Sequence, residues 1–202
     1  MNRGERLLII FSKNPLAGFV KTRLAASIGA EEALRVYEEL RAITERAAAG
    51  ADCSRAVFYS DYIPEEDLFL DGGTGAHLQQ GADLGERMHR AIVEGFRLGF
   101  RQVVLIGTDC PELSAFLIDR AFEALESHDA VIGPARDGGF YLVGLTRPVP
   151  ELFLQRQWSH GEVLRDTLAI LGGQQAETAI LPALSDIDTI EDLIGSSLWD
   201  PN

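Results

Sequence analysis

The sequence predicts an α/β protein, a layered sandwich built on a mostly parallel sheet. The first observation is the run Val103–Ile106, which is apolar, unbroken and rich in β-branched residues. Such a run is typical of a strand buried on both faces, so we expect it near the centre of the sheet with helices on both sides. The second is an alternation of strand-like and helix-like segments along the chain. With 202 residues, the chain suits a single domain spanning 1–202.

Each expected element follows from a local pattern. Short apolar runs bounded by polar or glycine-bearing segments predict strands, and apolar positions near helical spacing predict helices. The strands are expected at 7–11, 56–59, 77–80, 103–106, 129–133, 140–145 and 175–181. The helices are expected in a short segment before Leu24 and at 30–49, 83–99, 114–127, 161–171 and 189–198.

Helix caps and one turn complete the prediction. Asp83 and Ser114 can cap the helices that follow them, and Thr189 with Asp192 fits a capping box. The Asp-Gly-Gly turn at 137–139 is expected to precede a strand that runs antiparallel to the others.

Composition restricts the classes of function. The formal net charge is −13, which argues against binding nucleic acid or an anionic membrane. No apolar run approaches the roughly 20 residues of a membrane helix, and the N-terminal run is too short for a signal peptide. The two cysteines, Cys53 and Cys110, form no metal or redox motif. We therefore expect a cytoplasmic protein with free thiols.

The loop after the first expected strand holds both lysines of the chain, Lys13 and Lys21, together with Arg23. Point charges, a guanidinium fork and backbone N–H groups near Gly18 are the groups that hold phosphates in proteins. The spacing does not match a P-loop. A solvated basic loop is the alternative, although the acidic background of the chain makes three clustered cations notable.

Three acidic or glycine-bearing stretches are candidates for the remaining chemistry. Asp109 follows Val103–Ile106 at the edge where open α/β sheets bind ligands, and its alternative role is that of a turn residue. Asp186 and Asp188 precede a helix, and their alternative role is capping. Gly138 and Gly139 permit positive φ and close approach to a ligand, or form an ordinary hairpin turn.

Together these stretches resemble a known family. The chain is similar to the bacterial DUF2064 family, described as glycosyltransferase A-like within the nucleotide-diphospho-sugar transferase superfamily. The first loop is also similar to that of phospholactate guanylyltransferases. The resemblance spans nearly the whole chain, and its five motifs are Lys13–Leu24, Gly81–Met88, Gly107–Pro111, Asp137–Leu142 and Asp186–Thr189.

The resemblance implies a Rossmann-like three-layer α/β/α sandwich that binds a nucleotide and usually Mg²⁺ or Mn²⁺. Asp109 matches the metal-binding aspartate of the superfamily, and Asp188 matches the second aspartate of related nucleotidyltransferases. Lys21 and Asp109 are the expected catalytic residues. The expected nucleotide-binding residues are Lys13, Gly18, Lys21, Arg23, Gln80, Asp83, Gly85, Arg87, Gly138 and Gly139.

Two transferase reactions remain open at this stage. The three cations and the Asp109-Cys-Pro sequence, in place of an Asp-x-Asp motif, favour nucleotidyl transfer from a nucleoside triphosphate to a small acceptor. The customary family description favours glycosyl transfer from a nucleotide sugar. A non-catalytic nucleotide-binding protein is the third alternative, and a homodimer is possible. One departure concerns the acceptor, because His160-Gly161 stands where the family usually has Ser or Thr.

Overall fold

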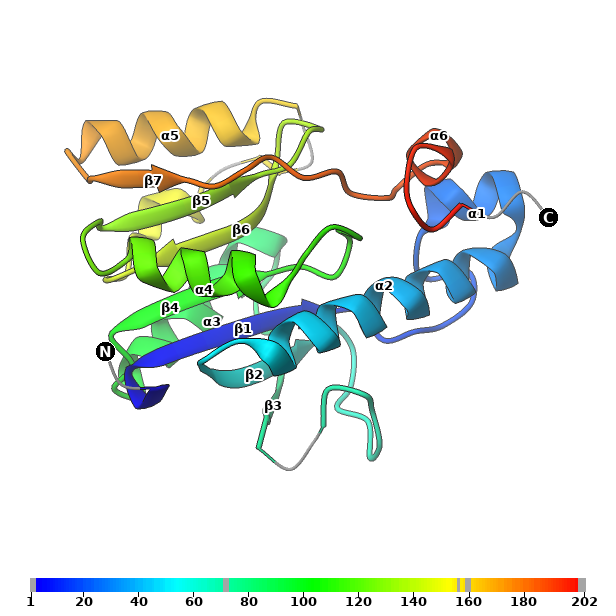
Figure 1. Cartoon of the computed structure of the whole chain (residues 1–202), viewed down its shortest axis with the longest axis horizontal. Coiled ribbons are helices and arrows are strands. Elements are labelled where there is room, and N and C mark those ends of the chain that lie inside the picture. Colours follow the sequence, from blue (N-terminus) through cyan, green and yellow to red (C-terminus); the bar gives the residue numbers. More distant parts are fainter. Residues whose placement is uncertain (1–2, 71–72, 156, 159–160, 200–202) are drawn as a thin grey trace.

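The centre of the protein is a seven-stranded sheet in the order β3-β2-β1-β4-β6-β5-β7 (Figure 1). The computed structural model describes residues 3–70, 73–155, 157–158 and 161–199. The strands are β1 Arg6–Ser12, β2 Ser54–Tyr59, β3 Gly75–Leu78, β4 Gln102–Ile106, β5 Ala130–Pro134, β6 Phe140–Leu145 and β7 Thr178–Ile180.

Strand β4 occupies the middle position of the sheet, as its apolar run predicts. All five of its residues are buried. It pairs in parallel with β1 on one side and antiparallel with β6 on the other. Strand β6 is also antiparallel to β5, whereas the β1–β2, β2–β3 and β5–β7 pairs are parallel. The mostly parallel sheet, with its antiparallel strand after the Asp137 turn, is confirmed.

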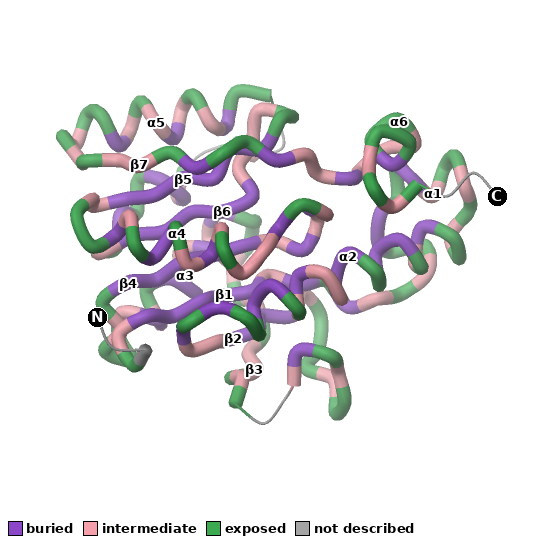
Figure 2. Tube along the Cα trace, in the orientation of Figure 1, coloured by how far each residue is buried: buried purple, intermediate pink, exposed green. Residues whose placement is uncertain are grey.

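Helices cover both faces of the sheet and complete the three layers. The α-helices are α1 Thr22–Ile28, α2 Ala30–Gly50, α3 Leu84–Arg97, α4 Ala115–Ala124, α5 Val163–Gly173 and α6 Ile190–Ile194, and the 3₁₀ helices are η1 Arg3–Glu5 and η2 Pro150–Leu152. One apolar cluster joins the sheet to α2 and α4, and a second joins the other face to α3, η2 and α5. Figure 2 shows the inner strands β1, β4, β6 and β5 as the most continuously buried part of the molecule.

A third, smaller cluster lies beyond the carboxyl end of β1 (Figure 1). It packs α1, the first half of α2 and α6 against one another through Leu24, Val36, Leu40, Ile187 and Leu193. The chain segments that lead into α1 and α6 therefore meet at the carboxyl edge of the sheet, where parallel α/β sheets bind their ligands.

Several predicted boundaries are wrong by a few residues. Strand β3 begins at Gly75 and ends at Leu78, because its register is set by pairing with β2, its neighbour in the sheet. Strand β7 covers three residues of the seven expected. Helix α4 ends at Ala124 rather than Ser127, and α6 ends at Ile194, with Gly195 as its C-cap. Short edge strands and frayed helix ends are where local pattern carries least information.

Two of the three predicted caps are confirmed. Asp83 accepts a hydrogen bond from the backbone N–H of Glu86 at 2.8 Å, and Thr189 forms the capping box with Asp192. Ser114 occupies the N-cap position of α4, but its side chain makes no capping hydrogen bond, so that prediction is wrong. Among the described residues, no helix combines the length and apolar character that crossing a membrane requires.

Candidate functional site

A cavity of about 780 Å³ opens at the carboxyl ends of the strands. The loops after β1 and β4, the start of β6 and the first turns of α1 and α3 contribute to its walls. Its volume lies in the range of small-molecule and cofactor sites. The walls combine cations, carboxylates and apolar side chains, so the cavity can accommodate a ligand with both a charged and an apolar part.

The cationic loop reaches this cavity with all three of its basic residues. Lys13, Lys21 and Arg23 line it together. Lys13 and Arg23 are exposed, whereas Lys21 is buried. Lys21 has φ 46° and ψ 45°, in the left-handed region that residues other than glycine seldom occupy. Such a conformation persists only where surrounding contacts hold it.

Two carboxylates hold the Lys21 ammonium group. Its Nζ donates to Asp109 Oδ1 and, at 3.1 Å, to Asp188 Oδ1. The Lys21 side chain is 4% exposed, while those of Asp109 and Asp188 are 47% and 44% exposed. Burial opposes the charged form of Lys21, but attraction by the two carboxylates outweighs it, so the pKa of Lys21 is raised. The sequence separates these three residues by up to 167 positions, and the fold joins them.

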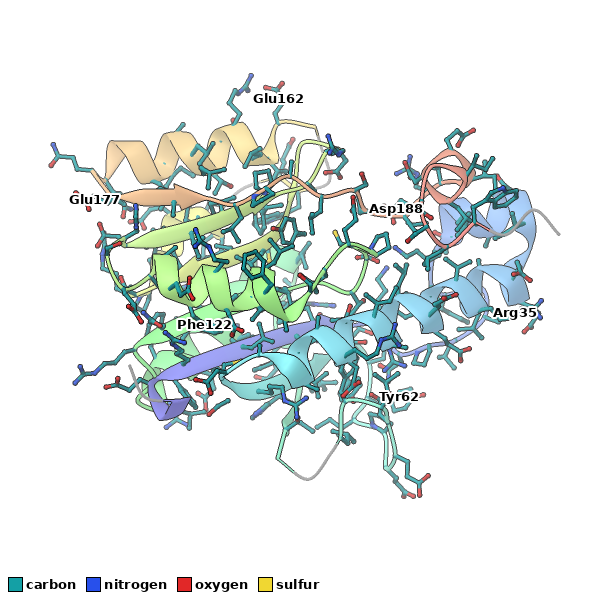
Figure 3. The ribbon with its side chains drawn as sticks, viewed as in Figure 1. Arg35, Tyr62, Phe122, Glu162, Glu177 and Asp188 are labelled. Carbon is teal, nitrogen blue, oxygen red and sulfur yellow. The ribbon has the colours of Figure 1, made fainter. Side chains whose placement is uncertain are left out.

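Backbone contacts explain why the two aspartates meet. Asp109 follows β4 after Gly107 and Thr108. The N–H of Ile187 donates to the carbonyl oxygen of Asp109 at 3.0 Å, which ties the segment before α6 to the loop after β4. Ile187 itself is fully buried in the third cluster. Asp188 then lies at the entry to α6, where it is labelled in Figure 3.

The donor set at this point fits Mg²⁺ or Mn²⁺. Both Oδ1 atoms contact one nitrogen, so they lie within roughly 6 Å of each other, twice a hydrogen-bond length. The two carboxylates are half exposed and face a common point. Magnesium needs one or two protein carboxylates, with phosphate oxygens and water as its other ligands. Among the described residues, no group of three or more His, Cys, Asp or Glu side chains has a metal-binding arrangement.

Asp186 faces a different hollow. It lines a neighbouring pocket of about 120 Å³ together with Asp109 and Asp137. Burial, followed by repulsion from Asp137, Asp188 and Asp109, raises the pKa of Asp186 to about 6. The structure therefore places Asp188, rather than its alternative Asp186, against Lys21.

Tyr37, a buried residue of α2 that the sequence analysis did not single out, connects the two loops of the site. Its hydroxyl oxygen accepts from the backbone N–H of Lys13 at 2.9 Å and lies 3.2 Å from both Lys13 O and Thr108 Oγ1. It also lies 3.5 Å from Ser12 Oγ. These contacts fix the start of the cationic loop relative to the loop that carries Asp109.

Several residues expected to bind nucleotide have structural roles away from the cavity walls. Gln80 is exposed, Asp83 caps α3, and Arg87 Nε donates to the carbonyl of Gly81 at 3.2 Å. Gly18 has φ 81° and shapes the loop turn. Of the expected nucleotide residues, the cavity is lined by Lys13, Lys21, Arg23 and Gly139.

Close packing explains two of the expected glycines. A Cβ on Gly85 would lie 2.0 Å from the carbonyl oxygen of Phe153 and 2.3 Å from Trp158 Nε1. Gly138 has φ 93°, and a Cβ there would lie 2.1 Å from the carbonyl oxygen of Gly161. These glycines let the segment after η2 approach α3 and the turn before β6. The expected close approach of backbone at Gly138 is therefore to the chain itself.

The cavity also has wall residues that the sequence analysis did not assign to a ligand. They include the hydroxyl side chains of Ser12, Thr22 and Thr108, the amide of Gln79, and the apolar or aromatic residues Phe11, Leu84, Met88, Leu105, Phe140, Tyr141, Trp158 and Val163. Apolar residues at strand ends and helix starts are indistinguishable by pattern from core residues, so no local signal separates them. Of His160-Gly161, where the chain departs from the family pattern, His160 lies outside the described residues and Gly161 lines the cavity.

The sequence profile of DUF2064, "Uncharacterized protein conserved in bacteria", matches residues 43–160, more than half of the chain. The chain belongs to the DUF2064 family. No curated protein has a significantly similar sequence.

Several solved structures share this fold. A crystal structure from Desulfovibrio desulfuricans G20, named "putative nucleotide-diphospho-sugar transferase", is 31% identical, with a TM-score of 0.86, and the match covers 94% of this chain and 85% of that one. CMP:2-keto-3-deoxy-manno-octonic acid synthetase complexed with CTP is 12% identical, with a TM-score of 0.56 over 95% and 96% of the two chains. Rv0371c of Mycobacterium tuberculosis H37Rv in complex with manganese is 13% identical, with a TM-score of 0.58 over 96% and 98%. The last two show the fold alone.

Proposed function

We propose that this DUF2064 protein is a metal-dependent transferase that moves a nucleotidyl group from a nucleoside triphosphate to a small acceptor. The observation that carries the proposal is the joining of Lys21, Asp109 and Asp188 at the wall of a ligand-sized cavity. The carboxylates are half exposed while the cation between them is buried. Carboxylates and a cation at a cavity wall are the groups that bind a triphosphate with its metal.

Each residue has a definite part in this proposal. Lys13, Lys21 and Arg23 bind and orient the phosphates through charge-assisted hydrogen bonds. Asp109 and Asp188 would hold Mg²⁺ or Mn²⁺, which neutralises charge on the phosphate oxygens when bound. The acceptor attacks the α-phosphorus and pyrophosphate leaves, so the protein contributes mainly positioning and electrostatic stabilisation.

Glycosyl transfer from a nucleotide sugar is the second candidate, supported by the name of the 31% identical relative. In that reaction the nucleoside diphosphate is the leaving group. The cationic loop and the Asp109-Cys-Pro sequence favour the first candidate, because three cations match the greater charge of a triphosphate. Binding of nucleotide without turnover is the third possibility, and a product assay separates it from both reactions.

A thermal-shift panel tests the proposal. Nucleoside triphosphates and nucleotide sugars are each added with and without Mg²⁺ or Mn²⁺. A ligand at 100 times its dissociation constant adds about 2.7 kcal/mol to the free energy of unfolding. We expect triphosphates with metal to stabilise the protein more than nucleotide sugars do. The reverse order would support glycosyl transfer, and no response to either class would contradict the proposal.

The variant Asp109→Asn makes the panel specific to the site. We expect it to abolish metal-dependent nucleotide binding while the unfolding midpoint without ligand stays close to that of the wild type. Glu38→Gln is the matched control, because it removes the same single charge from an exposed position on α2. If Asp109→Asn binds nucleotide and metal as the wild type does, the assignment of Asp109 is wrong.

A further inference from the structure

The ammonium group of Lys21 lies at the point where the two aspartates of the site converge. Its Nζ donates to Oδ1 of Asp109 and, at 3.1 Å, to Oδ1 of Asp188. A metal ion held between these carboxylates needs oxygen atoms from the same two side chains. Lys21 and a divalent cation therefore compete for one position, and this competition affects the order in which ligands bind.

The backbone of Lys21 is held in place, so only its side chain can leave this position. Its carbonyl oxygen accepts a hydrogen bond from the N–H of Ala25 in α1 at 2.7 Å. Val20 and Leu24 on either side are buried. The lysine side chain is a flexible four-carbon stem, and it lines the cavity. The ammonium group can therefore turn from the carboxylates toward the cavity while the loop keeps its fold.

The charges of this group balance while Lys21 contacts the carboxylates. Arg23 Nη1 lies 3.9 Å from Asp188 Oδ2, so two cations face two carboxylates. Arg23 is exposed and screened by water, which makes Lys21 the stronger of the two cations. A neutral set attracts a free divalent cation weakly. Adding that cation without moving Lys21 would also bring like charges together, which costs free energy.

A bound triphosphate changes this balance. Lys13, Lys21 and Arg23 line one cavity, so a triphosphate bound there offers the Lys21 ammonium group new anionic partners. Once Lys21 turns to the phosphates, both carboxylates can accept the metal ion that accompanies them. Triphosphate and metal therefore assist each other in binding, whereas metal alone must displace Lys21 without giving it another partner.

We propose that Lys21 excludes free metal from Asp109 and Asp188 and releases these carboxylates when a triphosphate binds. The site then takes up a metal–triphosphate complex in preference to the free cation. The inference rests on the proposed function and gives Lys21 a second role besides binding phosphate. It also predicts effects of opposite sign when the ammonium group is removed: triphosphate binds less tightly and metal alone binds more tightly.

Titration with Mn²⁺ alone, followed by the electron paramagnetic resonance signal of free Mn²⁺, tests the exclusion. We expect Lys21→Met to bind Mn²⁺ about tenfold or more tightly than the wild type, because it removes the competing charge at nearly equal side-chain length. Lys13→Met is the matched control from the same loop, since Lys13 is exposed and, among the described residues, pairs with neither aspartate. Its Mn²⁺ affinity should stay within about threefold of the wild type.

Two results of this titration contradict the proposal. Equal Mn²⁺ affinity in the wild type and Lys21→Met would mean that the metal uses carboxylate oxygens that Lys21 does not cover. An equal gain in Lys13→Met would mean that the net charge of the loop, rather than the position of Lys21, sets the metal affinity. Neither result involves a nucleotide, so the proposed function is decided separately by the thermal-shift panel.

Carbon-13 NMR of the wild-type protein tests the release and does not depend on the folding of Lys21→Met. The chain has two lysines, so labelling lysine at Cε gives two signals, and Lys13→Met identifies that of Lys21. Mg²⁺ is added with ATP, CTP, GTP or UTP in turn, and we expect the Lys21 signal to shift with those that bind. An unshifted Lys21 signal at saturation would show that the ion pairs persist, and the proposal would be wrong. If none of the four binds, the proposed function and the release both fail, and the Mn²⁺ titration decides the exclusion.

Discussion

Two buried cations, Arg41 and Lys21, lie near the end of β1 in very different surroundings. Their side chains are almost equally hidden, at 3% and 4% exposure. The carboxylate that pairs with Arg41 is 7% exposed, whereas those that hold Lys21 are 47% and 44% exposed. The two cations are therefore buried to the same extent. They differ in whether the carboxylates that pair with them are exposed to a ligand.

The surroundings of Arg41 are closed and complete. Its guanidinium donates to Asp67 Oδ2 and to Ser12 Oγ, and lies 5.2 Å from the ring centroid of Phe69. Asp67 accepts further hydrogen bonds from Tyr59 OH at 2.8 Å and from the N–H of Phe69 at 3.1 Å. Burial is the main cause that raises the pKa of Tyr59, which keeps this phenol protonated as a donor.

The surroundings of Lys21 are open on one side. Asp109 and Asp188 both line the cavity. Each is about half exposed, so its carboxylate can accept hydrogen bonds or bind a cation besides its contact with Lys21. A closed ion pair stabilises a loop, whereas an open one can exchange protein contacts for a ligand. The comparison teaches that burial of a cation alone does not indicate function, and that exposure of its partners does.

The largest expected effect in this comparison is loss of stability on replacing Arg41. Arg41→Met leaves the Asp67 carboxylate buried without its cation, and breaking a buried pair costs about 3–5 kcal/mol. Urea unfolding of Arg41→Met and Lys21→Met measures the difference between the two sites. We expect Lys21→Met to lose less than about 1 kcal/mol, because water can solvate its half-exposed partners. Equal losses would remove the distinction between closed and open pairs.

The next largest effect is on ligand binding by Lys21→Met. A charge-assisted contact contributes roughly 1.5–3 kcal/mol, so affinity for the preferred nucleoside triphosphate should fall about tenfold or more. Isothermal titration with Mg²⁺ present measures it. Arg97→Met, which removes an exposed cation at the end of α3, is the control and should leave affinity unchanged. Nucleotide affinity at the wild-type level in Lys21→Met would show that Lys21 serves the fold alone.

The smallest effect on nucleotide affinity is expected for a residue that connects the surroundings of Arg41 with those of Lys21. Ser12 Oγ accepts from Arg41 Nε and lies 3.5 Å from Tyr37 OH, which in turn contacts Thr108 beside Asp109. Tyr37→Phe leaves the N–H of Lys13 without its acceptor, so we expect a loss of about 1–2 kcal/mol in the free energy of unfolding. Nucleotide affinity should fall by about threefold, because the cationic loop loses one anchor. If Tyr37→Phe unfolds at the same urea concentration as the wild type, water has replaced the hydroxyl as the acceptor for the N–H of Lys13.

Much of the fold could be predicted because its signals are local. The apolar run of β4 requires burial on both faces, and the central place of the strand follows from that requirement. The capping box at Thr189 and the turn at Gly138 are likewise set by neighbouring residues. Edge strands such as β3 and β7 were predicted less well, because their limits depend on the partner strand.

For the site, the sequence by itself determined the chemistry available: two lysines in one loop, an aspartate after a buried strand, and a second aspartate before a helix. The resemblance already singled out Asp188 rather than Asp186, but only the tertiary structure decided that Asp188 meets Lys21, and that Gln79 rather than the expected Gln80 lines the cavity. In each pair the residue types are identical and the positions are adjacent or two apart. Side-chain direction distinguishes them, and it is fixed by contacts with distant segments, such as Ile187 N–H on Asp109 O and Gln79 Nε2 on Phe58 O.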